Sequence, residues 1–213
     1  MDDGKNYLGI AFGLMILLAT ATSQAQTKDI IDEWGAVTPP PPPALKPVTL
    51  DPKTTALLVL DFIKQSCNNE RRPRCVASIP KVEALLKQAR TNKASVIFSY
   101  TTSSTPADIA KELTPLKGEP MVRASSDKFL GADLEKILKE KGIKTVVVTG
   151  TSAHGAVLYT ASQAAFRGFQ VVVPVDGMSS ENTYFEQYTA YQLANVPGAG
   201  QLVTLTRTDM IKY

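Results

Sequence analysis

Residues 145–161 combine side chains that could do chemistry with a backbone pattern that would expose them. The β-branched run Thr145–Thr149 predicts a buried strand, and Gly150 marks a turn. Small residues and the single histidine of the chain, His154, precede a helical pattern of apolar residues that reaches Ala161. A helix that begins after a strand presents unpaired backbone N–H groups, which stabilise anions and developing negative charge. The sequence therefore predicts a ligand site at this turn.

A carboxylate ends another predicted strand. The apolar run Ala56–Leu60 is continuous, as expected for a strand of a parallel sheet that is covered on both faces, and Asp61 follows it directly. In open α/β sheets, ligands bind at the carboxyl ends of the strands. We expect Asp61 to act in the site, and the alternative is that it only caps a helix or a turn.

The two cysteines of the chain, Cys67 and Cys75, lie close together in a polar stretch. In an exported protein this spacing predicts a local disulfide that closes and stiffens a short loop. Because the chain has one histidine, a zinc site would lack nitrogen ligands. No GxxxxGK[ST] or GxGxxG motif follows a predicted strand, so we expect no metal and no nucleotide or other cofactor.

Predicted strands alternate with amphipathic helices. This order implies right-handed crossovers and one parallel sheet, so the fold class is α/β. The predicted strands are 56–61, 96–100, 121–122, 145–149, 170–175 and 202–206, and the predicted helices are 78–92 with Pro80 in the first turn, a short one near 108–112, 134–141, one after Gly150 and one after Ser180.

The N-terminal part of the chain predicts export. Residues 1–25 have an apolar core and a small-x-small cleavage sequence ending at Ala25, which indicate a signal peptide. The acidic start of this segment leaves an uncleaved membrane anchor as the alternative. Residues 26–53 form a leader centred on Pro39–Pro43, typical of a polyproline II spacer or arm. Residues 54–213 form the predicted domain, and the expected location is periplasmic or secreted.

The charges of the chain indicate no nucleic-acid partner. The formal net charge is +3, and 23 Lys and Arg are scattered among 20 Asp and Glu without a long basic run. A nucleic-acid-binding surface requires clustered positive charge. The expected partner is a small-molecule substrate, and contact with a membrane is expected only if the N-terminal segment stays uncleaved.

Three separated segments resemble the isochorismatase-like hydrolase superfamily. They are the strand that ends at Asp61, the segment Asp127–Leu134 and the stretch Val148–Ala161. The resemblance extends from about Thr54 to the C-terminus, and Asp176 after the fifth strand also suits the pattern. It implies a Rossmann-like three-layer fold with a parallel six-stranded sheet of order 3-2-1-4-5-6, commonly in a homo-oligomer, and a small pocket at the strand ends.

The resemblance also implies a catalytic set of an aspartate, a lysine and usually a cysteine. Asp61 matches the aspartate, which would transfer a proton. Counting from Gly150 places the family cysteine at Ala156, which cannot be a nucleophile. Isochorismatases also lack this cysteine, carry a pair similar to Ala153-His154, and hydrolyse a vinyl ether with the aspartate as general acid. That chemistry needs a positioned acid and a polar pocket rather than covalent attack.

The position of the catalytic cation is ambiguous. The usual family spacing, measured back from Phe129, places it at Arg123, whereas the nearest actual lysine is Lys128. Arginine stays charged and binds carboxylates, but it does not carry protons. Both residues stay open as the cation beside Asp61.

The turn supplies most of the predicted substrate-binding residues. By resemblance, the Ala153–His154 bond is expected to be a cis peptide that directs backbone N–H groups into the pocket. A histidine after a turn is also often satisfied by a backbone partner, and Phe129 could instead pack in the core. The predicted set is Ser152, Ala153, His154, Gly155 and Phe129.

Together these patterns predict an exported isochorismatase-like hydrolase that acts on a small anionic molecule through Asp61 without a cysteine nucleophile. The alternative is a catalytically inactive protein or small-molecule-binding module of the same fold. Tyr184, Tyr188 and Tyr191 recur at helical spacing, which indicates packing or a subunit contact.

Overall fold

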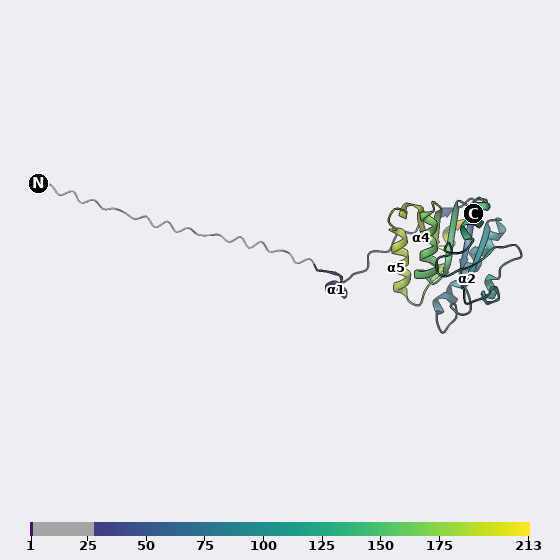
Figure 1. Ribbon diagram of the computed structural model, residues 1–213, viewed down its shortest axis with the longest axis horizontal. Helices are drawn as coiled ribbons and strands as arrows, with labels where there is room; N and C mark the ends of the chain where they lie inside the picture. Colours follow the sequence, from purple (N-terminus) through teal and green to yellow (C-terminus); the bar gives the residue numbers. More distant parts are fainter. Residues whose placement is uncertain (2–27) are drawn as a thin grey trace. The chain divides into compact units, whose positions relative to one another are not determined.

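The computed structural model of the protein describes Met1 and residues 28–213 (Figure 1). The predicted signal peptide, residues 1–25, lies outside the described residues apart from Met1. Residues 28–40 belong to a first unit that holds the short helix α1 (Ile30–Glu33), capped by the side chain of Asp29. Residues 41–213 form a second compact unit.

A parallel sheet forms the centre of the second unit. Its strands are β2 (Thr55–Leu60), β3 (Ser95–Tyr100), β4 (Met121–Arg123), β5 (Thr145–Thr151), β6 (Gln170–Pro174), β7 (Met178–Ser179) and β8 (Val203–Thr206). The order is β4-β3-β2-β5-β6-β8, and β7 pairs with the end of β5. Without the short β7, this order in chain numbering is 3-2-1-4-5-6. The predicted α/β fold and sheet order are therefore confirmed.

Helices cover both faces of the sheet and make three layers (Figure 1). Side chains of β2 alternate between the faces: Leu58 and Leu60 join one core, and Leu57 and Val59 join the other. The second core also contains the buried face of α2, whereas α3, α4 and α5 contribute to the first. The helices are α2 (Pro73–Thr91), α3 (Leu134–Glu140), α4 (Leu158–Phe166) and α5 (Thr183–Ala194), with short helical turns at η1 (Pro106–Asp108), η2 (Lys111–Leu113), η3 (Ala153–Val157), η4 (Gly200–Leu202) and η5 (Thr208–Met210).

Two predicted helices differ from the structure. Helix α2 begins at Pro73 rather than near Ser78, because proline suits a first helical position where no N–H bond is needed. Pro80 lies inside the helix, and the Ser78 hydroxyl donates to the Cys75 carbonyl instead of capping the N-terminus. The single short helix predicted near residues 108–112 is the pair of 3-10 turns η1 and η2.

The end of the predicted leader lies along the C-terminal part of the chain. The two-residue strand β1 (Val48–Thr49) pairs with β9 (Ile211–Lys212) in a separate parallel sheet. The Lys46 N–H also donates to the Leu205 carbonyl over 2.9 Å. The boundary predicted at residue 54 stays a prediction. No helix within residues 28–213 is long and apolar enough to cross a membrane.

Candidate active site

Asp61 leaves β2 with a backbone conformation that few residues adopt. Its φ is +56°, in the left-handed region that costs free energy for a residue with a side chain. Two contacts hold the backbone there: the Asp61 N–H donates to the Ser99 carbonyl over 3.2 Å, and the Ser66 hydroxyl donates to the Asp61 carbonyl over 3.0 Å. Strand β2 ends one residue earlier, at Leu60, and these contacts fix the backbone position from which the Asp61 carboxylate extends.

The carboxylate of Asp61 forms a buried ion pair. Lys128 Nζ donates to Asp61 Oδ2 over 2.6 Å, and the Ser99 hydroxyl donates to Oδ1 over 2.7 Å. The side chain of Lys128 is 0% exposed and that of Asp61 is 7% exposed. Lys128 Nζ also donates to the Ser125 carbonyl over 2.6 Å. Donors and acceptors around the pair are therefore matched, which a buried charge requires.

Burial raises the pKa of the Asp61 carboxyl above its ordinary value, because the charged form loses hydration. The ion pair and hydrogen bond with Lys128 act against this, followed by the hydrogen bond from Ser99 and the charge of Arg72. A carboxyl group with a raised pKa can hold a proton. Once it has given up the proton, an adjacent cation stabilises the carboxylate that remains. Those are the two states that an acid–base group alternates between.

Arg123 lies elsewhere. It ends β4 with an exposed side chain, and its guanidinium donates to the Thr102 carbonyl. Of the two predicted cations, Lys128 is the one that contacts Asp61. It reaches the carboxylate from the loop after β4, where its own N–H faces the Thr160 hydroxyl at 3.3 Å. The contact favours Lys128 over Arg123 as the cation beside Asp61, and the catalytic role of Lys128 stays a prediction.

A glycine brings the ends of β2 and β5 together. Leu60 is the register partner of Gly150, and a Cβ atom at Gly150 would lie 2.7 Å from the Leu60 Cβ. Only glycine allows the two backbones to come this close. Asp61 and Thr151, which follow Leu60 and Gly150 in the chain, therefore lie at adjacent points on the same edge of the sheet.

The turn after β5 differs from the prediction in one detail. The cis peptide bond joins Thr151 and Ser152, so the predicted cis bond between Ala153 and His154 is wrong. The cis peptide bond lies at the end of β5, and the π-helical turn η3 begins one residue later, at Ala153. The Gly155 backbone packs on Ser152, since a Cβ at Gly155 would lie 2.6 Å from the Ser152 hydroxyl oxygen.

His154 belongs to a chain of polar contacts. Its Nδ1 lies 2.7 Å from the Ser180 hydroxyl, and that hydroxyl donates to Glu181 Oε2 over 2.9 Å. A serine hydroxyl has one proton, so Nδ1 must be the donor to Ser180. The imidazole also stacks on Phe185 with ring centroids 4.0 Å apart. His154 is thus held by side chains rather than by a backbone partner.

The remaining predicted residues are buried. Ala156 lies inside η3 and offers only a methyl group where the family motif predicts a nucleophile. Phe129 is part of the core, with the Phe169 ring 6.3 Å away and the Arg167 guanidinium 4.6 Å from its centroid. Among the described residues, no group of three or more His, Cys, Asp or Glu is placed to hold a metal ion.

Sequence reasoning missed Arg72, Ser99 and Glu181. Arg72 Nε and Nη2 donate to Glu181 Oε1 over 2.7 and 2.5 Å, and Nη1 donates to the Thr151 hydroxyl over 3.4 Å. Ser99 was detectable, because it lies near the end of the strand next to β2. Arg72 lies between the two cysteines, a position that gives no sign of contact with β5.

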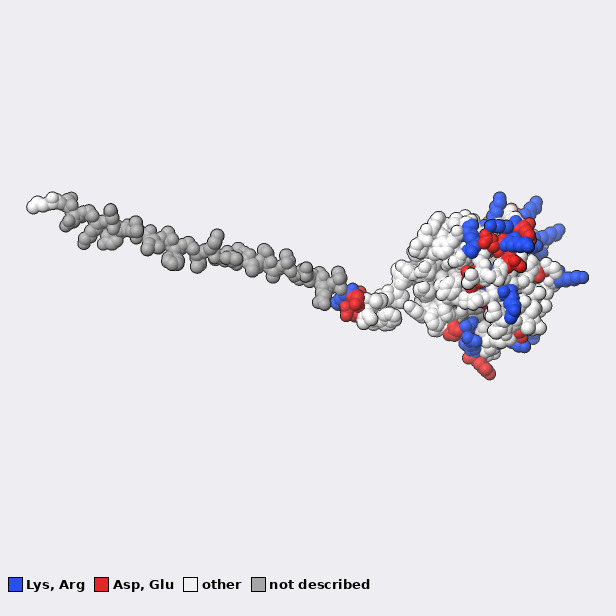
Figure 2. All heavy atoms as spheres, in the orientation of Figure 1, with Lys and Arg blue, Asp and Glu red and all other residues white. Residues whose placement is uncertain are grey.

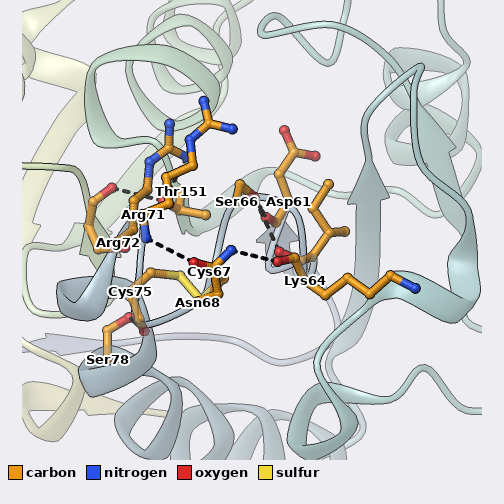
Figure 3. Close-up of a disulfide and its surroundings, with 12 residues drawn as sticks. Asp61, Lys64, Ser66, Cys67, Asn68, Arg71, Arg72, Cys75, Ser78 and Thr151 are labelled. Atoms are coloured by element: carbon orange, nitrogen blue, oxygen red, sulfur yellow. Dashed lines mark hydrogen bonds between the residues drawn. A yellow bond between two sulfur atoms is a disulfide. The ribbon is translucent and has the colours of Figure 1, made fainter.

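The predicted disulfide is confirmed. Cys67 and Cys75 are bonded, and both are buried. Figure 3 shows Asp61 and Arg72 on either side of Cys67 in the same loop. Cys75 lies in the first turn of α2, so the bond ties the start of that helix to the segment that follows Asp61.

A surface cavity lies in another part of the molecule. It has a volume of about 570 Å³ and is lined by α2 and by residues that follow β6 and β8, among them Lys81, Asp176 and Arg207. Asp176 accepts from the N–H and the hydroxyl of Thr208, over 2.8 and 3.0 Å. Its visible role is therefore to hold the turn after β8. The buried Asp61–Lys128 pair, rather than this cavity, has the chemistry of an active site.

The fold is that of a parallel α/β protein, and the buried acid–lysine pair forms a candidate site at the carboxyl ends of the strands. A family model described as Isochorismatase domain matches residues 55–207, and the chain therefore belongs to the isochorismatase family. The chain is 28% identical over 148 residues to the secreted isochorismatase effector Isc1 of Verticillium dahliae, which covers 64% of this chain and 78% of that protein. It is 31% identical over 102 residues to N-carbamoylsarcosine amidase from Arthrobacter, covering 44% of this chain and 38% of the amidase.

A solved structure shares the fold. The isochorismatase-like hydrolase from Alkaliphilus metalliredigens superposes with a TM-score of 0.66 at 23% identity, over 73% of this chain and 95% of that one.

Proposed function

We propose that the protein hydrolyses a small anionic molecule with Asp61 as general acid and base, and without a covalent intermediate. The observation that carries this proposal is the buried contact of 2.6 Å between Lys128 Nζ and Asp61 Oδ2. A buried ion pair is a weak source of stability, because loss of hydration offsets much of the attraction. Its place at the strand ends supports a functional role.

The chemistry that fits this pair is hydrolysis of an enol ether such as isochorismate. The Asp61 carboxyl gives its proton to the terminal carbon of the enol, which leaves an oxocarbenium ion. Water adds to that ion and returns a proton to the Asp61 carboxylate. The resulting hemiketal separates into pyruvate and an alcohol, so the acid is regenerated. Lys128 stabilises the carboxylate between the two proton transfers.

The absence of a thiol at position 156 supports this choice among hydrolytic reactions. Amide hydrolysis by a thioester route requires a nucleophile, and Ala156 is buried and aliphatic. Protonation of an enol ether does not require one.

Export is part of the proposal. The predicted signal peptide, the Cys67–Cys75 disulfide and the similarity to a protein described as secreted support a periplasmic or secreted location. Disulfides persist outside the reducing cytosol, which agrees with such a location.

The test is release of pyruvate from isochorismate by the purified full chain. Asp61→Asn keeps the size of the side chain but removes the acid, and we expect a loss of about 10²–10⁴-fold in kcat. Asp133→Asn, which changes an exposed aspartate, is the matched control. Activity that survives Asp61→Asn would contradict the proposal.

A second candidate function is a binding module of the same fold, which the buried methyl group of Ala156 favours. In that case isochorismate and a panel of small amides and esters are bound saturably but are not converted. Ala156→Cys then provides a further measurement, since gain of amide hydrolysis would show that only the nucleophile is missing.

A further inference from the structure

We propose that Arg72 binds a carboxylate of the substrate beside Asp61, from a loop that the Cys67–Cys75 disulfide closes. This inference rests on the proposed function and adds the residue that selects anionic substrates. It gives a role to a buried cation that neither the family motifs nor the reaction scheme explains.

The guanidinium of Arg72 lies against the edge of the sheet where Asp61 emerges. Arg72 Nη1 is 3.4 Å from the hydroxyl of Thr151, and Thr151 follows the register partner of Leu60 just as Asp61 follows Leu60. The Arg72 side chain is 9% exposed. Its charge also lowers the pKa of Asp61, which agrees with a position near the carboxylate. An anion bound beside Asp61 would therefore meet this guanidinium.

The hydrogen bonds of Arg72 leave one nitrogen available. Nε and Nη2 both donate to the same oxygen, Oε1 of Glu181. Within the described residues, Nη1 has one hydrogen bond, the long one to Thr151. A guanidinium carries five N–H donors and stays charged at every physiological pH. The Nη1 group therefore retains a donor for a carboxylate oxygen.

The segment 61–75 carries both the acid and the guanidinium: Arg72 lies inside the loop that the disulfide closes, and Asp61 lies six residues before Cys67. The Ser66 hydroxyl donates to the Asp61 carbonyl over 3.0 Å, and the Arg72 N–H donates to the Asn68 carbonyl over 2.8 Å. The disulfide joins Cys67 to Cys75 within the same segment. Arg72 precedes the first residue of α2, so the fixed helix start also fixes its Cα. The position of the guanidinium relative to Asp61 is thus set by local structure.

A purely structural role is the competing explanation, in which Arg72 only ties the loop to Glu181 before α5. The two explanations differ in what Glu181→Gln does. That variant removes the carboxylate partner and keeps the guanidinium, so a binding role predicts that affinity for anions is retained or increased. A structural role predicts that Glu181→Gln and Arg72→Met weaken the site alike.

The experiment compares two ligands of similar shape, the anion 2,3-dihydroxybenzoate and the uncharged 2,3-dihydroxybenzamide, in which a carboxamide replaces the carboxylate, by calorimetric titration of the full chain. We expect Arg72→Met to weaken benzoate binding about 10- to 100-fold, the range for a charge-assisted hydrogen bond, and to leave benzamide binding unchanged. The benzoate affinity of Arg72→Lys should lie between those of the wild type and Arg72→Met, because lysine keeps the positive charge but lacks the planar guanidinium with its paired N–H donors. Arg71→Met is the matched control, since Arg71 is the exposed neighbour.

Kinetics with isochorismate test the role of Arg72 separately from the role of Asp61. With isochorismate, Arg72→Met should raise KM by about the same factor and change kcat less. Equal losses for benzoate and benzamide, or equal effects of Arg72→Met and Glu181→Gln, would overturn the role of Arg72 while Asp61-dependent turnover still stands. If no variant turns over isochorismate, selective binding of the benzoate still supports Arg72, and failure to distinguish the two ligands contradicts it.

Discussion

Lys128 Nζ lies 2.6 Å from Asp61 Oδ2, although the two residues are 67 positions apart in the chain. The contact joins the end of β2 to the loop after β4, and both side chains are almost fully removed from water. The sheet order makes this possible, since β3 alone separates β2 from β4. The pair therefore couples two distant segments of the chain through one buried charge contact.

Lys128→Met should destabilise the protein by about 3–5 kcal/mol, because it leaves a buried carboxylate without its partner. The loss should be smaller at acidic pH, where the carboxyl is protonated. The free energy of unfolding in urea at neutral and acidic pH measures both effects. The double variant Asp61→Asn/Lys128→Met should recover most of the loss, whereas the exposed Lys136→Met should have little effect. A double variant as unstable as Lys128→Met would contradict the pairing.

The stability of the protein should decrease with rising pH through the titration of Asp61. Burial raises the pKa of this carboxyl above its ordinary value of 3.8, so between the two values the native state binds more protons than the unfolded state. The stabilisation is complete below the unfolded-state pKa and is lost as pH rises through the folded-state pKa. Urea unfolding of the wild type and Asp61→Asn across this range isolates the contribution. If the stability of the wild type relative to Asp61→Asn instead rose with pH, the attraction of Lys128 would outweigh the effect of burial on the pKa of Asp61.

Removal of the disulfide should affect both stability and substrate binding. The bond closes a loop with a sequence separation of 8, for which loop entropy gives about 2–3 kcal/mol. Cys67→Ala/Cys75→Ala should lower the free energy of unfolding by about that amount. The same variant should raise KM for isochorismate as Arg72→Met does, because Arg72 lies inside the loop. An unchanged KM in a folded double variant would show that the bond does not position Arg72.

A second copy of the chain is expected to cover the outer face of α4 and α5. The two helices contact each other, and each carries exposed aromatic side chains. Figure 2 shows little charge over this part of the molecule, whereas Lys, Arg, Asp and Glu gather elsewhere. A neutral aromatic face has no like-charge repulsion to prevent self-association. The residues are Tyr159, Phe166, Tyr184, Tyr188 and Tyr191.

Light scattering after size exclusion tests this face. The wild type should be oligomeric, and Tyr188→Glu should shift it toward the monomer. Leu116→Glu, at an exposed apolar residue on another part of the surface, is the control. A monomeric wild type would contradict the proposed contact.

The sequence predicts the sheet well because continuous apolar runs and their terminators are local signals. The buried strand from Thr55 is such an apolar run, and Gly142 is such a terminator, since α3 ends just before it. The predicted start of α2 is wrong because Pro73 and Pro80 both suit a first turn, and the helix begins at the earlier of the two. The two-residue strand β7 depends on pairing with β5 and has no signal of its own.

The site was less predictable than the fold. Asp61 is a candidate from the sequence because it follows a strand, but the choice between Arg123 and Lys128 as its partner depends on the path of the loop after β4. That path directs Arg123 to the Thr102 carbonyl and Lys128 into the interior. The contacts of Arg72 with Thr151 and Glu181 join residues 79 and 109 positions apart, and spacing within the chain cannot predict such contacts.

The most direct test of the account is the pH dependence of kcat/KM for pyruvate release from isochorismate, measured for the wild type and Asp61→Asn. The account predicts that wild-type activity falls as pH rises through the raised pKa of Asp61, and that Asp61→Asn is about 10²–10⁴-fold slower and lacks this limb. An Asp61→Asn variant with wild-type activity and an unchanged pH profile would contradict it.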